Sequence, residues 1–175
     1  MDFLLFVEQT LNGFQFGIFL FLIAAGLTLV FGIMNLVNLA HGSLYMIGAY
    51  FAATAYQWTG SFLLAILLAL PASLLVGVVV EMVVLRTLYQ RGHMDQVLAT
   101  FGLLLFFNEA VRMIWGPESQ QMAIPAWLTG HVEIIPGILY PQYRVAIIAV
   151  GLLLAAFLYV LISRTRMGML IRAGA

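Results

Sequence analysis

Four hydrogen-bonding side chains stand inside an apolar stretch of the chain, "GIMNLVNLAHGSLYMIGAY" (32–50). They are Asn35, Asn38, His41 and Ser43. Amide, imidazole and hydroxyl groups can bind a polar solute, or they can bind one another across helices, and neither use requires bond chemistry. The stretch contains no carboxylate, so its residues do not form the pattern of an intramembrane proton relay.

The sequence His41-Gly42-Ser43 raises the question of a serine nucleophile. Residues two apart on a helix do not face each other, and the chain has no G-x-S-x-G motif, so we reject an intramembrane serine protease. His93 and His131 have no metal-ligand spacing with each other or with His41. The chain also has no cysteine, so the sequence predicts neither a metal site nor a disulfide.

The composition identifies the solvent in which these residues must work. The chain has 175 residues, of which 64% are hydrophobic and 8% are charged, and its mean hydropathy is +1.09. A soluble domain carries about 25% charged residues, so this chain cannot cover a water-facing surface. We therefore predict an all-α, polytopic integral membrane protein. The net charge is zero and the seven basic residues form no patch, which argues against nucleic acid as a partner.

Apolar runs predict about five transmembrane helices, each long enough to cross the hydrocarbon core at about 1.5 Å per residue. The predicted helices cover residues 12–34, 36–58, 61–85, 97–115 and 145–163. Residues 86–96 form a polar loop, and Trp58-Thr59-Gly60 makes a short turn. Residues 116–143 hold four of the five prolines, so we expect an irregular external loop there.

Arginine positions predict the orientation. With about five crossings the two termini lie on opposite sides of the membrane. One side then carries the larger group of arginines, which are Arg86, Arg91, Arg164, Arg166 and Arg172, and the other side carries Arg112 and Arg144. The positive-inside rule makes the first side cytoplasmic and places the N-terminus outside.

On a helical wheel, the polar residues of the second predicted helix are sorted onto one side. Asn35, Asn38, Gly42, Tyr45 and Ala49 fall in one stripe with spacings of 3 and 4 residues, and His41 lies on its flank. Such a stripe should face protein or a water-filled cavity. It either forms interhelical hydrogen bonds, each worth about 0.6 kcal/mol, or lines a solute pathway in which Gly42 marks a helix break. Both interpretations stay open.

Other polar groups lie along the later helices. Thr100 and Asn108 give the helix over 97–115 a second polar set. We expect Glu81 to reach the cytoplasmic interface by snorkelling, with a buried functional carboxylate as the alternative. Glu109 and Arg112 have the i, i+3 spacing of an ion pair near the outer interface.

Three stretches resemble one family, in its order and with its spacing. They are "GLTLVFGIMNLVNLAHGSLYMIGAY", "VEMVVLRTLYQRGHMDQVLATFGLLLFFNEAVRMIWG" and "RTRMGMLIRAGA". The chain closely resembles permease subunits of bacterial ABC importers for branched-chain amino acids, a family type that includes urea permeases. The resemblance implies one permease domain over residues 1–175 in the bacterial inner membrane. It also implies a second permease subunit, cytoplasmic ATPase subunits that use ATP, and a periplasmic solute-binding protein.

The resemblance also implies roles for individual residues. The family's polar pathway segment corresponds to Asn35, Asn38, His41, Gly42, Ser43 and Tyr45, and its second block corresponds to Thr100, Gly102 and Asn108. The start of the cytoplasmic loop that contacts the ATPase corresponds to residues 164–175, with Gly168, Arg172 and Ala173 as its matching positions. The resemblance assigns no catalytic residue and no cofactor bound by this chain.

Family members continue past this loop with further helices, so we expect a fragment or a shortened permease. The leading hypothesis is a subunit that moves a branched-chain amino acid without bond chemistry. The alternatives are a permease for urea or for another amino acid, a channel that needs no ATPase, and a membrane protein that binds partners without transporting.

Overall fold

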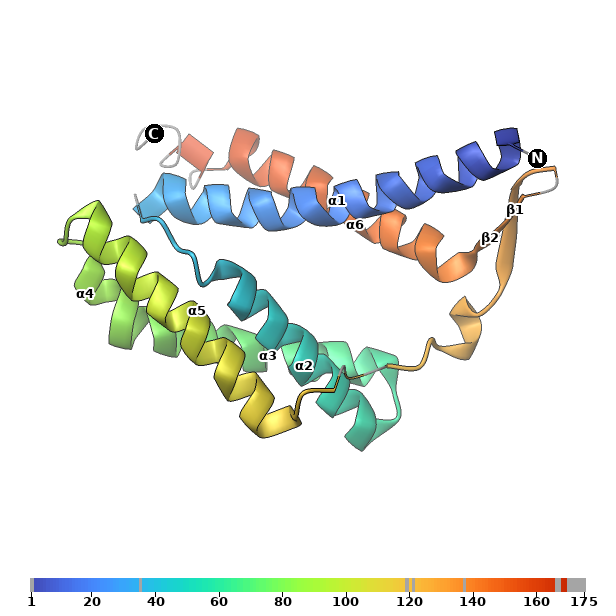
Figure 1. The fold of residues 1–175 in the computed structure, drawn as a ribbon. Helices are drawn as coiled ribbons and strands as arrows, with labels where there is room; N and C mark the ends of the chain where they lie inside the picture. Colours follow the sequence, from blue (N-terminus) through green and yellow to red (C-terminus); the bar gives the residue numbers. More distant parts are fainter. Residues whose placement is uncertain are drawn as a thin grey trace. The chain divides into compact units, whose positions relative to one another are not determined.

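Figure 1 shows the computed structural model of the chain. It describes residues 2–34, 36–118, 120, 122–136, 138–165 and 168–169. Long helices dominate these residues, and they are α1 (Asp2–Met34), α2 (His41–Thr59), α3 (Phe62–Val80), α5 (His93–Trp115) and α6 (Gln142–Arg164). The predicted all-α class is confirmed.

Several helix starts and one loop differ from the prediction. Residue 12 was expected to begin the first helix, but α1 already starts at Asp2. The polar loop over 86–96 is shorter than predicted, because the π-helical segment η1 (Glu81–Leu85) and α4 (Arg86–Leu88) continue α3. The next helix, α5, then begins at His93. Charged and polar residues at these points made the sequence pattern look like loop, but Glu8, Arg86 and Thr87 are exposed residues within helices.

The predicted irregular loop over 116–143 is partly wrong. It contains a short 3-10 turn, η2 (Ala126–Leu128), and an antiparallel hairpin of β1 (His131–Ile135) and β2 (Ile138–Pro141). In this hairpin Val132 pairs with Tyr140. The prolines of this region do not prevent pairing, because a two-stranded hairpin has only edge strands, where proline is tolerated.

Four helices in the described residues are long and apolar enough to cross a membrane. They cover Phe3–Gly32, Phe62–Leu88, His93–Trp115 and Gln142–Arg164. The chain is therefore a multi-pass membrane protein. The fifth predicted crossing corresponds to α2, which carries histidine, glutamine and hydroxyl side chains and is not among these four helices. The orientation of the helices stays a prediction.

The chain forms two compact units. Unit 1 comprises Met1–Leu29 and Ile124–Ala175, and unit 2 comprises Val30–Ala123. In unit 2, α2, α3 and α5 lie side by side (Figure 1). Their common apolar core consists of Leu36, Ile47, Val80, Leu85, Leu88, Phe107 and Val111. Gly60 makes the tight turn from α2 to α3, with a φ of +64° that favours glycine and an N–H that donates to the carbonyl of Tyr56 at 2.8 Å.

In unit 1, a close approach of the two backbones and a polar cluster join α1 to α6. A Cβ at Gly151 of α6 would overlap the side chain of Ile18 on α1, so glycine permits this contact. Near the start of α6, the Tyr140 hydroxyl donates to the Oδ1 atom of Asn12 at 3.1 Å. The Arg144 guanidinium also donates to Asn12. Asn12 therefore fixes the end of the hairpin and the start of α6 to α1.

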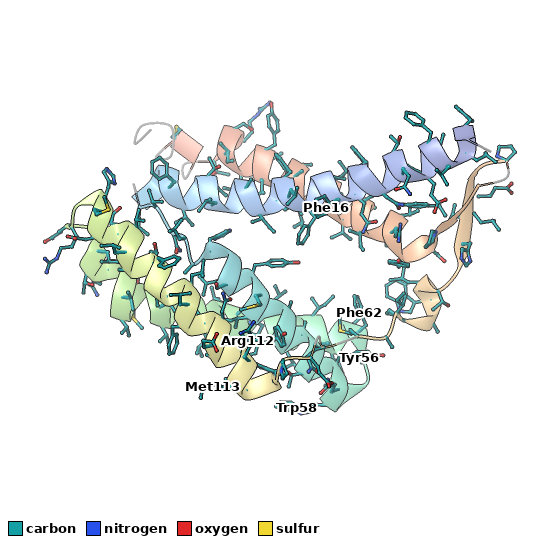
Figure 2. The ribbon with its side chains drawn as sticks, viewed as in Figure 1. Phe16, Tyr56, Trp58, Phe62, Arg112 and Met113 are labelled. Carbon is teal, nitrogen blue, oxygen red and sulfur yellow. The ribbon has the colours of Figure 1, made fainter. Side chains whose placement is uncertain are left out.

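Large apolar side chains cover the outer faces of these helices. In unit 2, Met113 is 85% exposed and Trp58 is 82% exposed, and Figure 2 shows both at the outer edge of the unit. Water would oppose so much exposed apolar surface, whereas acyl chains or partner helices would not. The arrangement therefore fits a chain whose helices contact lipid or other apolar helices.

Candidate functional site

The stretch before α2 is not helical, and this changes the predicted stripe. The helix begins at His41 rather than near Leu36. Residues 36–40, which we call the entry segment, bury Leu36, Asn38 and Ala40 almost completely. Asn38 therefore does not share a helical face with Gly42. Asn35 lies outside the described residues.

Asn38 uses its side chain locally. Its Oδ1 atom accepts a hydrogen bond from the buried backbone N–H of Ala40 at 3.0 Å. Its own carbonyl accepts from the His41 N–H at 3.3 Å. Such side-chain bonds to a nearby backbone N–H give the chain an alternative to helix, and this explains why α2 starts late. Asn38 holds the entry segment in place.

Within α2 the predicted pathway residues lie on two sides of the helix. Gly42, Tyr45 and Ala49 lie on the exposed side of the helix, and His41 is half-buried beside them. Ser43 is only 5% exposed and faces the core with Ile47. The helical period places Ser43 about 100° away from Gly42, so the two residues cannot serve the same surface.

Thr100 connects α5 to the entry segment. Its side chain is fully buried, and its Oγ1 atom lies 2.8 Å from the carbonyl oxygen of Gln96 and 3.3 Å from that of Val37. The carbonyl oxygen of Val97 also lies 3.3 Å from Oγ1, and a hydroxyl has a single proton, so these three carbonyls share one donor. The structure thus brings Thr100 close to the segment that contains Asn38. It leaves Gly102 exposed and Asn108 half-buried further along α5.

Gln96 is a buried polar residue that the sequence reasoning missed. Its side chain is 3% exposed, and its Nε2 atom donates to the carbonyls of Leu88 at 3.2 Å and Arg91 at 3.3 Å. These bonds close the turn between α4 and α5. Its position four residues before Thr100 was an available signal, because i and i+4 side chains lie on one helix face.

Glu81 has a more specific environment than the predicted interfacial position implied. It begins the π-helical segment η1, in which the Arg86 N–H donates to the Glu81 carbonyl. The Tyr89 hydroxyl donates to its Oε1 atom at 3.1 Å. Burial raises the pKa of Tyr89, and the hydrogen bond to Glu81 raises it further. The Tyr89 hydroxyl therefore keeps its proton and stays a donor to the carboxylate.

The opposite end of unit 2 is fastened by aromatic and polar contacts. The Trp115 indole N–H donates to Thr54 at 2.7 Å, and its ring centroid lies 5.2 Å from that of Tyr50. The predicted pair of Glu109 and Arg112 is confirmed, with 3.5 Å between the charged atoms and both side chains exposed. An exposed pair of this kind contributes little to stability.

Of the three predicted ATPase-coupling positions, Arg172 and Ala173 lie outside the described residues. Gly168 is buried after the end of α6, and its N–H donates to the Thr165 hydroxyl at 3.4 Å. A Cβ at this position would overlap the carbonyl of Ile162, so only glycine fits this turn. Among the residues that the structure describes, no three His, Cys, Asp or Glu side chains gather as metal ligands would.

Comparison with known proteins identifies the chain. The family model for the permease component of branched-chain amino acid transport systems matches residues 9–175. The chain belongs to this family. The match begins at residue 9, within the first helix that can cross a membrane, and includes the other three such helices together with α2 and the entry segment.

Curated relatives of this permease chain carry the same description. It is 32% identical to the high-affinity branched-chain amino acid transport system permease protein BraD of Pseudomonas aeruginosa, over 97% of this chain and 59% of the relative. It is 29% identical to the permease protein LivH of Escherichia coli, over 99% of this chain and 60% of the relative. The chain thus spans about 60% of the length of these relatives. No solved structure matches it.

Proposed function

We propose that this chain forms part of the membrane pathway of an ATP-driven importer for leucine, isoleucine and valine. The observation that carries the proposal is the family match over residues 9–175, which coincides with four helices able to span the membrane. Both relatives compared above are permease proteins of high-affinity branched-chain amino acid systems. The chain itself supplies the passage and performs no bond chemistry.

The proposed assembly contains several other subunits. A second permease subunit completes the pathway, a periplasmic solute-binding protein delivers the amino acid, and cytoplasmic ATPase subunits bind and hydrolyse ATP. The permease binds no cofactor of its own. The arginine distribution supports a chain with its N-terminus outside and Arg86, Arg91 and Arg164 on the cytoplasmic side of the inner membrane.

Within this chain, the exposed side of α2 is the proposed pathway wall. Gly42, Tyr45 and Ala49 offer a small, partly polar surface, and the imidazole of His41 lies at its start. Asn38 and Thr100 do not form part of this wall but position it. Their bonds to Ala40 and Val37 fix the entry segment, and the entry segment fixes where α2 begins.

Energy from the ATPase must reach this wall through differential contacts in the inward and outward states. Residues 164–175 are the proposed contact with the ATPase, and Gly168, Arg172 and Ala173 are its candidate positions. The turn at Gly168 supports this proposal, because a side chain there would collide with the last turn of α6. Substitution of Gly168 would therefore change how the loop leaves the membrane.

The proposal is tested by uptake into proteoliposomes that contain the complete transporter with its binding protein. Labelled leucine should accumulate only when ATP reaches the ATPase subunits. Leucine uptake at the same rate with and without ATP would favour a channel. Accumulation of urea in place of leucine would reassign the substrate, and both outcomes would reject the function proposed here.

A further inference from the structure

An open groove runs along the α2–α3 side of unit 2, and a carboxylate stands at one end of it. Leu44 of α2 and Leu74 and Val78 of α3 contribute its apolar wall, and Ser73 and Glu81 also line it. Its volume is about 800 Å³. Sites for small molecules commonly have volumes of about 300–1,000 Å³, with apolar walls and a few polar groups.

Glu81 is the one acidic residue in the apolar span Phe62–Leu88. Carboxylates inside membrane spans are costly, so each needs a functional or structural partner. Among residues 2–34, 36–118, 120, 122–136, 138–165 and 168–169, the recorded ion pair is that of Glu109 with Arg112, and no cation lies within 4.0 Å of Glu81. Tyr89 supplies one hydrogen bond, whereas an ionised carboxylate has about four lone-pair sites. Glu81 can therefore accept a further donor.

The backbone at Glu81 gives a second, independent signal. Glu81 is the first residue of η1. The Arg86 N–H donates to the carbonyl of Glu81, five residues earlier, whereas in an α-helix it would donate to the residue four earlier. A single π-helical turn inside an α-helix is uncommon, and such turns occur frequently at functional sites. Because the π turn begins at Glu81, the regular α-helical hydrogen-bond pattern of α3 ends just before this residue.

Glu81 stands at about the same level of the helix pair as His41, although Gly42, Tyr45 and Ala49 do not line the groove. A Cβ at Gly48 of α2 would lie 3.1 Å from the Ser73 hydroxyl oxygen of α3, so Gly48 and Ser73 are at the same level of this helix pair. His41 lies seven residues before Gly48, a rise of about 10 Å, and Glu81 lies eight residues after Ser73, a rise of about 12 Å. Both residues therefore stand near the same end of the helix pair.

We propose that Glu81 binds the α-ammonium group of an aliphatic amino acid whose side chain lies against Leu74 and Val78. This inference rests on the proposed function, which supplies a ligand with one ammonium group and a branched apolar side chain. A bare divalent cation would need several oxygen ligands, and a single carboxylate does not provide them. An ammonium group carries three donors and needs the carboxylate that this apolar groove presents.

Modification of Glu81 by dicyclohexylcarbodiimide tests the proposal in the complete transporter, reconstituted in lipid vesicles and read by mass spectrometry. The probes are 3-methylbutylamine, which has the ammonium group without the carboxylate, and 4-methylpentanoate, which has the carboxylate without the ammonium group. The amine at ten times its Kd should slow labelling of Glu81 about tenfold, as should leucine. The acid should leave the labelling unchanged, and labelling of Glu109 should respond to neither probe.

Variants give a second measurement. Glu81→Gln keeps the size of the side chain and removes its charge, so thermal stabilisation by 3-methylbutylamine should disappear. Glu109→Gln, the matched control on α5, should keep that stabilisation. If Glu81→Gln does not fold, the labelling of Glu81 in the protein without substitutions still tests the proposal.

Three results would overturn the proposal. They are equal protection of Glu81 by the acid, no protection by the amine, and a carboxylate that never reacts because a partner's cation covers it. Leucine uptake in the same vesicles separates the two proposals. ATP-driven uptake without protection of Glu81 rejects this site alone, whereas protection without leucine uptake rejects the proposed function.

Discussion

Replacement of Asn38 by leucine should loosen the entry segment without unfolding the protein. Leucine has the same branched skeleton and number of side-chain heavy atoms as asparagine, but it cannot accept the hydrogen bond from the Ala40 N–H, which is fully buried and now bonded at 3.0 Å. A buried N–H without a partner costs about 1–3 kcal/mol. The middle of this range, about 2 kcal/mol, corresponds to a change of about 30-fold in the equilibrium for local opening.

Hydrogen exchange read by mass spectrometry measures this opening in detergent or nanodiscs. Amides of residues 36–44 should lose about 30-fold of protection in Asn38→Leu, whereas amides of α6 in unit 1 should keep theirs. Asn38→Ser is the matched control, because its hydroxyl can still accept from a nearby N–H and should preserve part of the protection. Leucine uptake should fall in Asn38→Leu while membrane insertion is retained. Unchanged protection of residues 36–44 would refute the role given to Asn38.

Three further substitutions test contacts in the two units, each by thermal unfolding in one detergent. Thr100→Val removes the hydroxyl bonded to the entry segment and should lower the free energy of unfolding by about 1 kcal/mol. An unchanged melting temperature would show that this hydroxyl does not stabilise the protein. Trp115→Phe keeps an aromatic ring but loses the N–H bonded to Thr54 at 2.7 Å, and should cost about 1 kcal/mol. Gly151→Val should cost about 1–3 kcal/mol through overlap with Ile18, and a neutral effect would mean that the α1–α6 contact is loose.

The helices were predictable because long apolar runs leave few alternatives in a membrane chain. The turn at Gly60 was also predictable, since a glycine between two such runs favours a left-handed helix end. The hairpin over residues 131–141 was not. Its prolines indicate loop by composition, and only the pairing of two short edge strands makes them compatible with a sheet.

The entry segment shows why helical spacing alone placed Asn38 wrongly on the face of Gly42 and Tyr45. Asn38, Gly42 and Tyr45 have the 3.6-residue spacing of one helix face, but that spacing says nothing about a competing local bond. The side chain of Asn38 satisfies the Ala40 N–H directly, so the helix begins later. The exposed positions Gly42, Tyr45 and Ala49 keep their common face, because they lie within the helix that does form.

The groove at Glu81 could not be read from the sequence at all. It depends on the antiparallel pairing of α2 with α3, which brings Leu44 beside Leu74 and Val78. The sequence predicted that Glu81 reaches the cytoplasmic interface, with a buried functional carboxylate as the alternative, and neither interpretation placed a groove beside it. The π turn and the bond from Tyr89 are tertiary and backbone details for which no residue pattern gave a signal.

Cysteine accessibility along α2 tests the central claim most directly, and the chain offers a clean background because it contains no cysteine. Single cysteines at Gly42, Tyr45 and Ala49 would be compared with one at Leu67, which is 65% exposed on the apolar face of α3. The account predicts that a membrane-impermeant aqueous reagent labels the three α2 positions in the complete transporter, that leucine slows this labelling, and that only a lipid-phase reagent labels position 67. Labelling of all four positions by the lipid-phase reagent alone would contradict a solute pathway along α2.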